Sequence, residues 1–183
     1  MASGLPFYYY HIPDRTGIKL SMEEFLLKAR DVIPNLRGIK FSSKDLFEGS
    51  KCLRIKDSRG NNFDLLYGCD EQVIAAFAMG FQGAIGSTYS LMPGVYRRAR
   101  RALEEGHVAE ARELQYRSVR LVDICFKFGQ GMGGPLPAFK AILSELGIPM
   151  GSTRFPMASM DQQMRAKLKD ELVQIGFFQW AQE

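Results

Sequence analysis

The sequence predicts an α/β fold with a parallel sheet, followed by a region made of helices. Two observations lead to this fold class. Up to about Gly86, short aromatic and β-branched runs alternate with amphipathic helical patterns, whereas only helical patterns occur from about Met92 onward. Strands that alternate with helices pair in parallel, because each helix returns the chain to the start of the next strand. The chain has 183 residues, of which 46% are hydrophobic and 24% charged, so it is long enough for an ordinary packed domain.

The first two strands flank a well-marked helix. An aromatic and β-branched run over Leu5–Ile12 predicts the first strand, which the segment Pro13–Gly17 breaks. Ser21–Glu24 has the form of a capping box, so a helix is expected to begin there. Its apolar residues fall on one face and are Met22, Phe25, Leu26, Ala29 and Ile33. Pro34 and Asn35 end this helix, and Leu36–Phe41 is expected to be the second strand.

Two further strands follow in the same rhythm. Residues 42–46 can cap a helix that runs to about Ile55, and the turn at Asn61-Asn62 leads into a third strand over Phe63–Tyr67. Asp70 can cap the next helix, and Gly80 is expected to end it. Gly83–Gly86 is a short fourth strand. Later helices are expected over Tyr96–Glu105, His107–Phe128, Pro137–Leu146 and Asp161–Ile175.

Composition excludes several classes of protein. The net charge of +4 is too small for a dedicated nucleic-acid protein, so no nucleic-acid partner is expected. The three cysteines (Cys52, Cys69 and Cys125) have neither disulfide-framework nor zinc spacing, which favours a reducing, cytoplasmic location and no metal. Residues 72–96 carry no charge, but glycine, proline and polar residues interrupt them, so no membrane span is expected. The amino-terminal residues lack the pattern of a signal peptide.

Polar and catalytic residue types gather where the predicted strands end. These strand ends are Tyr10-His11, Lys40, Gly68–Glu71 and Gly86–Tyr89. In parallel α/β folds the carboxyl ends of neighbouring strands, about 4.8 Å apart, converge on one cleft. His11 points away from Tyr10 if the strand alternates regularly, so packing is its expected role.

Lys40 is the residue with the most specific chemistry among these. Ile39 and Phe41 flank it, so its amine is partly desolvated and nucleophilic near neutral pH, as Schiff-base formation with a carbonyl requires. A tyrosine on the adjacent strand can carry a proton beside it. Taken singly, each feature has a simpler explanation: a strand-end lysine is more often a solvated rim residue, and Asp70-Glu71 is more often a helix cap. Together, at successive strand ends, they favour a catalytic site.

These residues resemble a known family, the pyruvate-dependent class I aldolases that include N-acetylneuraminate lyase and dihydrodipicolinate synthase. The motifs that carry the resemblance are Tyr8-Tyr-Tyr-His-Ile-Pro13, Thr16-Gly17, Gly38-Ile-Lys-Phe-Ser42, Gly68-x-Asp-Glu71, Gly83-Ala-Ile-Gly-Ser-Thr-Tyr89 and Gly147-Ile-Pro-Met-Gly151. The resemblance implies the C-terminal half of a (β/α)8 barrel, with four βα units over residues 1–106. A helical extension over residues 107–183 would pack on this barrel. The first and third motifs mark the superfamily, whereas Gly68-x-Asp-Glu71 and the Gly-Ser-Thr-Tyr part of the fifth motif point to the N-acetylneuraminate lyase branch.

The resemblance also implies a reaction and the residues that perform it. Lys40 would form the Schiff base with the substrate's ketone, and Tyr10 would transfer protons in a retro-aldol cleavage of N-acetylneuraminate to N-acetylmannosamine and pyruvate. The sugar's hydroxyl tail would be held by six residues, Ser42, Gly68, Asp70, Glu71, Gly86 and Ser87. No cofactor is needed, and the family assembly implied is a homotetramer.

Two features leave alternatives open. Arg15 resembles the dihydrodipicolinate synthase branch, where an arginine at this place helps to bind a carboxylate, so another aldolase or synthase of the superfamily is the alternative activity. A full (β/α)8 barrel takes about 250 residues and eight strands, and only four strands are expected here. The chain is therefore either part of an enzyme that is catalytic in a longer form, or a non-catalytic half-barrel that pairs with another chain.

Overall fold

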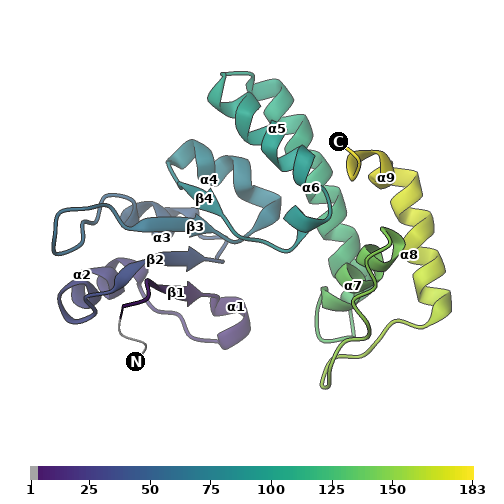
Figure 1. The fold of residues 1–183 in the computed structure, drawn as a ribbon, viewed down its shortest axis with the longest axis horizontal. Coiled ribbons are helices and arrows are strands. Elements are labelled where there is room, and N and C mark those ends of the chain that lie inside the picture. The colour runs from purple at the N-terminus through teal and green to yellow at the C-terminus, as the bar shows by residue number, and fades with distance from the viewer. Residues whose placement is uncertain (1–3) are drawn as a thin grey trace. The chain divides into compact units, whose positions relative to one another are not determined.

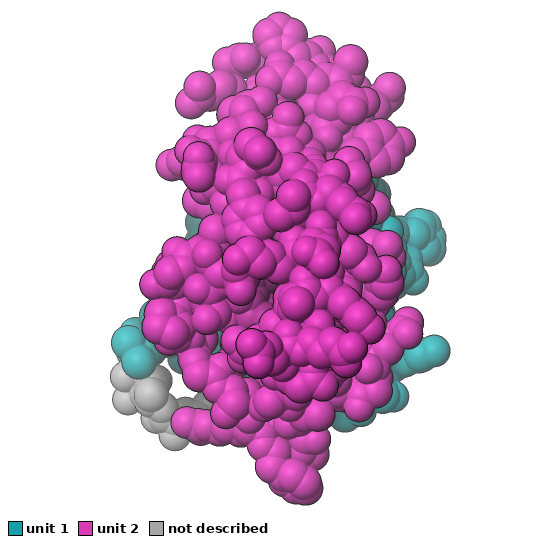
Figure 2. Space-filling model, turned by 90° about the vertical axis from the view of Figure 1, so that its right-hand side faces the viewer, with its two compact units in different colours: residues 1–86 teal, residues 87–183 magenta. Residues whose placement is uncertain are grey.

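The computed structural model describes residues 4–183 and divides into two compact units, residues 1–86 and 87–183, which Figure 2 colours separately. The first unit holds the strands β1–β4, and the second holds the helices α5–α9. The boundary predicted between barrel and helical extension lies after residue 106, so that the helix over Tyr96–Glu105 belongs with the strands. That grouping stays a prediction.

The strands form one parallel sheet in the order β1-β2-β3-β4, as the sequence predicted (Figure 1). Their bounds are β1 (Phe7–His11), β2 (Leu36–Phe41), β3 (Asp64–Tyr67) and β4 (Gly83–Ala84). The second strand has the bounds expected from the sequence, and the others are shorter by one or more residues at their ends. The ladder continues beyond β4, because the amide of Ile85 donates to the carbonyl of Tyr67 at 2.8 Å.

The helices of the first unit confirm most of the expected pattern. They are α1 (Pro13–Thr16), α2 (Met22–Val32), α3 (Leu46–Cys52), the 3-10 turn η1 (Asp70–Gln72) and α4 (Val73–Met79). The hydroxyl of Ser21 caps α2 by accepting from the amide of Glu24 at 3.3 Å. Gly80 ends α4 in the left-handed conformation, with φ of 109°.

Two expectations about these helices are wrong. The third helix ends at Cys52 instead of near Ile55, because Lys56 then pairs with Asn62 in an isolated antiparallel bridge. Asp70 does not cap α4, whose first turn has no side-chain cap. Asp70 begins η1 instead, and its side chain is buried.

The two faces of the sheet differ in what covers them. Side chains alternate along a strand, so Ile39 and Phe41 of β2 lie on one face and Lys40 on the other. The first face packs on the helices and forms the core together with Leu65 and Tyr67 of β3. On β1, the His11 ring packs against Phe41 with ring centroids 5.1 Å apart, which confirms its expected packing role. Burial lowers the pKa of His11.

Gly38 on β2 is required by its surroundings. A Cβ atom at this position would lie 2.0 Å from the carbonyl oxygen of Asp64 and 2.9 Å from its Cβ atom. The backbone of β3 therefore approaches β2 more closely than any other residue type at position 38 permits.

We expect Gly38→Ala to lower the free energy of unfolding by about 1–3 kcal/mol, because the added methyl group forces β2 and β3 apart. Urea unfolding followed by circular dichroism measures this change. The double variant with Asp64→Ala tests the cause. Since the nearest clashing atom belongs to the backbone, the double variant should stay destabilised, and full recovery would contradict this explanation.

The second unit consists of helices, as the sequence predicted from about Met92 onward. They are α5 (Pro93–Glu104), α6 (Val108–Gly129), α7 (Leu136–Glu145), α8 (Gln162–Ile175) and α9 (Phe177–Trp180), preceded by the 3-10 turn η2 (Thr88–Ser90). The hydroxyl of Tyr96 on α5 forms hydrogen bonds with Thr88 and, at 2.7 Å, with Ser118 of α6, and this polar network is buried. Within the described residues, no helix combines the length and the apolar character that crossing a membrane would require.

Candidate active site at the carboxyl ends of the strands

Tyr10 and Lys40 lie side by side on the face of the sheet opposite the helical core. Strand register places Tyr10 of β1 directly beside Lys40 of β2. The Nζ atom of Lys40 is 4.1 Å from the centroid of the Tyr10 ring, which is within cation–π distance. The Tyr10 side chain is 47% exposed, and Lys40 is half-buried. The two residues expected to be catalytic are thus in contact and accessible to a small molecule.

Backbone hydrogen bonds draw the segments after the strands together. The amide of Ser42 donates to the carbonyl of His11, and the amide of Gly68 donates to the carbonyl of Phe41, both at 2.8 Å. Together with the Ile85–Tyr67 bond, these interactions extend the parallel ladder past the ends of β1, β2 and β3. The expected substrate-binding residues Ser42, Gly68 and Gly86 therefore follow one another along the carboxyl edge of the sheet.

Two of these residues are glycines because polar side chains occupy the adjoining space. A Cβ atom on Gly68 would lie 1.9 Å from Oγ of Ser42, and one on Gly86 would lie 1.5 Å from Oδ1 of Asp70. The Ser42 and Asp70 side chains are both buried. Within the described residues, Oγ of Ser42 is buried and has no hydrogen-bond partner, which is uncommon for a buried hydroxyl.

The turn η1 presents the two acidic residues of the site. The hydroxyl of Tyr67 donates to Oε1 of Gln72 at 2.8 Å and so fixes the end of η1 to β3. Glu71 is held by Lys44, whose Nζ atom is 3.5 Å from Oε1 of Glu71. Cys69 immediately precedes η1. Burial raises the pKa of its thiol to about 11, which keeps the thiol protonated and unreactive at neutral pH.

Sequence reasoning missed Lys44 as the partner of Glu71. Both residues follow predicted strands, so their proximity depends on the order of strands in the sheet. Ser87, the remaining expected binding residue, follows Gly86 in the chain and is the exposed first residue of the second unit.

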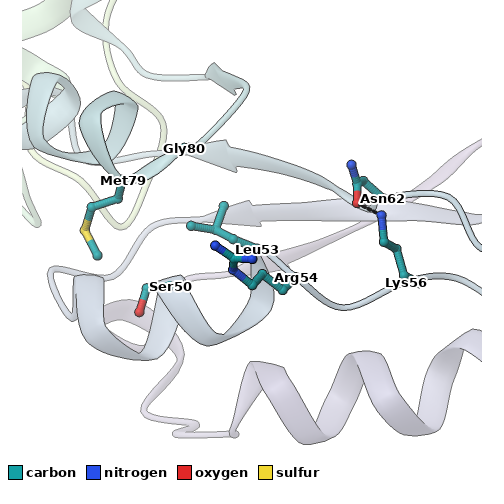
Figure 3. Close-up of a pocket in the computed structure, with 7 residues that line it drawn as sticks. All are labelled: Ser50, Leu53, Arg54, Lys56, Asn62, Met79 and Gly80. Carbon is teal, nitrogen blue, oxygen red and sulfur yellow. Dashed lines mark hydrogen bonds between the residues drawn. The ribbon is translucent and has the colours of Figure 1, made fainter.

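A separate hollow of about 690 Å³ lies on the first unit, away from this edge. It is lined by Ser50, Leu53, Arg54, Lys56, Asn62, Met79 and Gly80 (Figure 3). Asn62 and Gly80 precede β3 and β4, so this hollow lies toward the amino ends of the strands. Nζ of Lys56 donates a hydrogen bond to Oδ1 of Asn62 there, as the dashed line shows. In α/β folds the reacting groups gather at the opposite, carboxyl edge, where Lys40 and Tyr10 lie.

Solved structures with the same fold are longer than this chain. Over 94% of this chain, N-acetylneuraminate lyase from Proteus mirabilis superposes with a TM-score of 0.84 at 29% identity, and 55% of that chain is covered. The enzyme from Aliivibrio salmonicida gives a TM-score of 0.83 at 31% identity, with 54% of that chain covered. These neighbours are (β/α)8-barrel aldolases. The fold is therefore the expected half of an α/β barrel followed by helices, and the chain is a barrel half with a lysine at the carboxyl edge of its sheet.

The sequence comparisons identify the family. The Dihydrodipicolinate synthetase family matches residues 1–175, and the chain belongs to it. Among curated relatives, N-acetylneuraminate lyase of Rattus norvegicus is 37% identical over 96% of this chain. N-acetylneuraminate lyase A of Xenopus laevis is 42% identical over 86% of it. The chain spans about half the length of the curated relatives that it matches, 53% and 50% for these two.

Proposed function

We propose that this chain carries the Schiff-base half of a pyruvate-dependent class I aldolase, and that the reaction is the reversible cleavage of N-acetylneuraminate to N-acetylmannosamine and pyruvate. The observation that carries the proposal is the contact between Lys40 and Tyr10 at the carboxyl edge of a half-barrel of this family. A cytoplasmic location and a homo-oligomeric assembly belong to the same proposal.

Lys40 and Tyr10 divide the chemistry between them. The Lys40 amine attacks the C2 ketone of the open-chain sugar and, with loss of water, forms a protonated imine. The imine accepts the electron pair of the C3–C4 bond as that bond breaks, which leaves an enamine. Tyr10 takes the proton of the C4 hydroxyl and returns a proton to the enamine carbon. Hydrolysis of the resulting imine releases pyruvate and restores the free lysine.

The carboxyl edge suits a substrate with many hydroxyl groups. The carboxyl oxygens of Asp70 and Glu71 can accept hydrogen bonds from hydroxyls, and the Ser42 hydroxyl can both donate and accept. Gly68, Gly86 and Ser87 complete the proposed binding set by offering backbone groups and, from Ser87, a further hydroxyl. This set supports a polyol tail as the group that the site holds.

A second activity, that of a synthase in the same superfamily, is favoured by Arg15. This exposed residue on α1 follows β1, the strand that carries Tyr10. An arginine there suits the carboxylate of an aldehyde substrate that carries an acid group.

The experiment that separates these activities offers two aldehydes to the pyruvate-treated protein. N-acetylmannosamine and aspartate semialdehyde are supplied in turn, and the consumption of pyruvate is followed. Consumption with N-acetylmannosamine alone supports the proposed function. Consumption with aspartate semialdehyde alone supports the synthase, and consumption with neither would contradict both.

Gly86→Ala is expected to weaken sugar binding while leaving the reaction with pyruvate intact. The added Cβ atom displaces the Asp70 carboxylate, and the loss of one charged hydrogen bond costs about 1.5–3 kcal/mol, or roughly 10- to 100-fold in affinity. Titration of N-acetylmannosamine into the pyruvate-treated protein, followed by calorimetry, measures this affinity. Unchanged sugar affinity in a folded Gly86→Ala variant would remove Asp70 from the binding set.

A further inference from the structure

A hydrogen bond joins β1 and β3 across the strand between them. The hydroxyl of Tyr8 donates to Oδ2 of Asp64 at 2.5 Å. Gly38 of β2 is the register partner of both residues, so the bond passes over this glycine. The hydrogen bond spans three strands because position 38 has no side chain to obstruct it.

This bond lies directly below the proposed catalytic pair. Tyr8 and Tyr10 are two residues apart on β1 and therefore share a face of the sheet. On the neighbouring strand, Gly38 and Lys40 have the same relation and pair with Tyr8 and Tyr10 respectively. One layer of the sheet holds Tyr8, Gly38 and Asp64, and the next layer toward the carboxyl edge holds Tyr10 and Lys40.

The register of β1 is irregular at this point. Phe7 pairs with Leu36 whereas Tyr8 pairs with Gly38, so the register shifts between Phe7 and Tyr8. A slip of one residue in a strand turns every side chain to the opposite face, which would move Tyr10 away from Lys40. Irregularities of this kind re-aim the side chains that follow them. Tyr8 is the first residue after this shift, so an interaction that fixes Tyr8 also fixes the face on which Tyr10 lies.

We propose that Tyr8 and Asp64 are positioning residues, whose hydrogen bond across Gly38 holds the Tyr10 ring against the amine of Lys40. The catalytic part of this inference rests on the proposed function. Tyr8 is suited to this task at neutral pH, because the hydrogen bond to Asp64 raises the pKa of Tyr8 and keeps its hydroxyl protonated.

Deuterium exchange into the methyl group of pyruvate tests the proposal. In D₂O the imine loses a methyl proton to give the enamine and then takes up a deuteron, a step assigned to Tyr10. Borohydride trapping of the imine measures the Lys40 step separately. Tyr9→Phe is the matched control, since Tyr9 lies on the same strand but its ring packs against Phe25 with centroids 4.6 Å apart.

Tyr8→Phe and Asp64→Ala are expected to slow exchange by about tenfold or more at an unchanged trapping rate, since a small misplacement of a catalytic group is costly. Asp64→Asn keeps an acceptor for the Tyr8 hydroxyl and should restore most of the exchange. The proposal is overturned if Tyr8→Phe and Asp64→Ala exchange as fast as Tyr9→Phe. It is also overturned if exchange and trapping fall together in proportion to the folded fraction, because that result indicates a general loss of stability.

A spectroscopic measurement keeps this test independent of activity. The Tyr10 ring current should shift the resonances of the Lys40 side-chain protons upfield, since the amine lies over the ring. Tyr8→Phe and Asp64→Ala should lose this shift, and Tyr9→Phe should keep it. If the wild-type chain neither traps nor exchanges pyruvate, the proposed function fails, and the upfield shift alone decides whether Tyr8 and Asp64 position Tyr10. An upfield shift that persists in both variants would overturn the positioning role.

Discussion

Replacing Lys40 with methionine is expected to abolish formation of a covalent adduct with pyruvate. Methionine is unbranched and similar in length, so it can fill the space beside Tyr10, but it has no amine to form an imine. The expected loss is complete, because no other residue in the proposed mechanism is a nucleophile. Intact-protein mass spectrometry after treatment with pyruvate and borohydride measures the adduct.

A matched control shows whether the loss is specific to Lys40. Lys28 on α2 is well exposed and pairs with Glu24 one helical turn away, so Lys28→Met removes an equivalent amine outside the site. This variant should form the adduct as the wild type does. An adduct that persists in Lys40→Met would assign the chemistry to a different amine and contradict the proposed mechanism.

Tyr10→Phe is expected to separate the two steps of the reaction. The phenylalanine ring still packs beside the amine of Lys40, so the imine should form and borohydride should trap it. Proton transfer by a positioned side chain contributes about 10²–10⁴-fold, and methyl exchange of pyruvate should slow by that factor. Proton NMR in D₂O follows the exchange.

A control variant and a contradicting result can be stated for Tyr10→Phe. Tyr116→Phe on α6 removes a phenol that is 60% exposed and has no part in the proposed mechanism, so exchange should remain at the wild-type rate. Loss of trapping in a folded Tyr10→Phe variant would mean that Tyr10 is needed for imine formation. The roles assigned to Tyr10 and Lys40 would then be wrong.

Much of the fold follows from local patterns in the sequence. The run Leu36–Phe41 has the bounds of β2, and Ser21 caps α2 as its capping box predicts. Both depend on neighbouring residues alone. Asp70 shows where local reasoning fails, because an acidic residue before a helix usually caps it, whereas here Gly86 leaves space that the Asp70 carboxylate fills. That space is created by a residue that follows β4, 16 positions further along the chain than Asp70.

Part of the candidate site could also be predicted from the sequence. Lys40 and Tyr10 could be placed together because consecutive parallel strands align their carboxyl ends. The hydrogen bond between Tyr8 and Asp64 could not, since it depends on the register of three strands and on the irregularity at Phe7. Asp64 was visible only as a charged residue within an otherwise apolar run.

The exposed edges and face of the sheet are relevant to whether this chain functions without a partner chain. Among the described strands, β1 and β4 lie at the two edges of the sheet, and the face that carries Tyr8 and Tyr10 is partly exposed. Exposed edges and faces of this kind are normally covered in stable proteins. The lyase and the non-catalytic half-barrel share this structure, and the chemistry of Lys40 distinguishes them.

Peptide mapping after reductive trapping tests the central claim most directly. The folded 183-residue chain is incubated with pyruvate, reduced with borohydride, digested and analysed by mass spectrometry, with a sample lacking pyruvate as the control. The proposed function predicts a single modified peptide, with the reduced pyruvate adduct on Lys40. A folded chain that shows no adduct on Lys40 would contradict the claim that this chain carries the Schiff-base lysine.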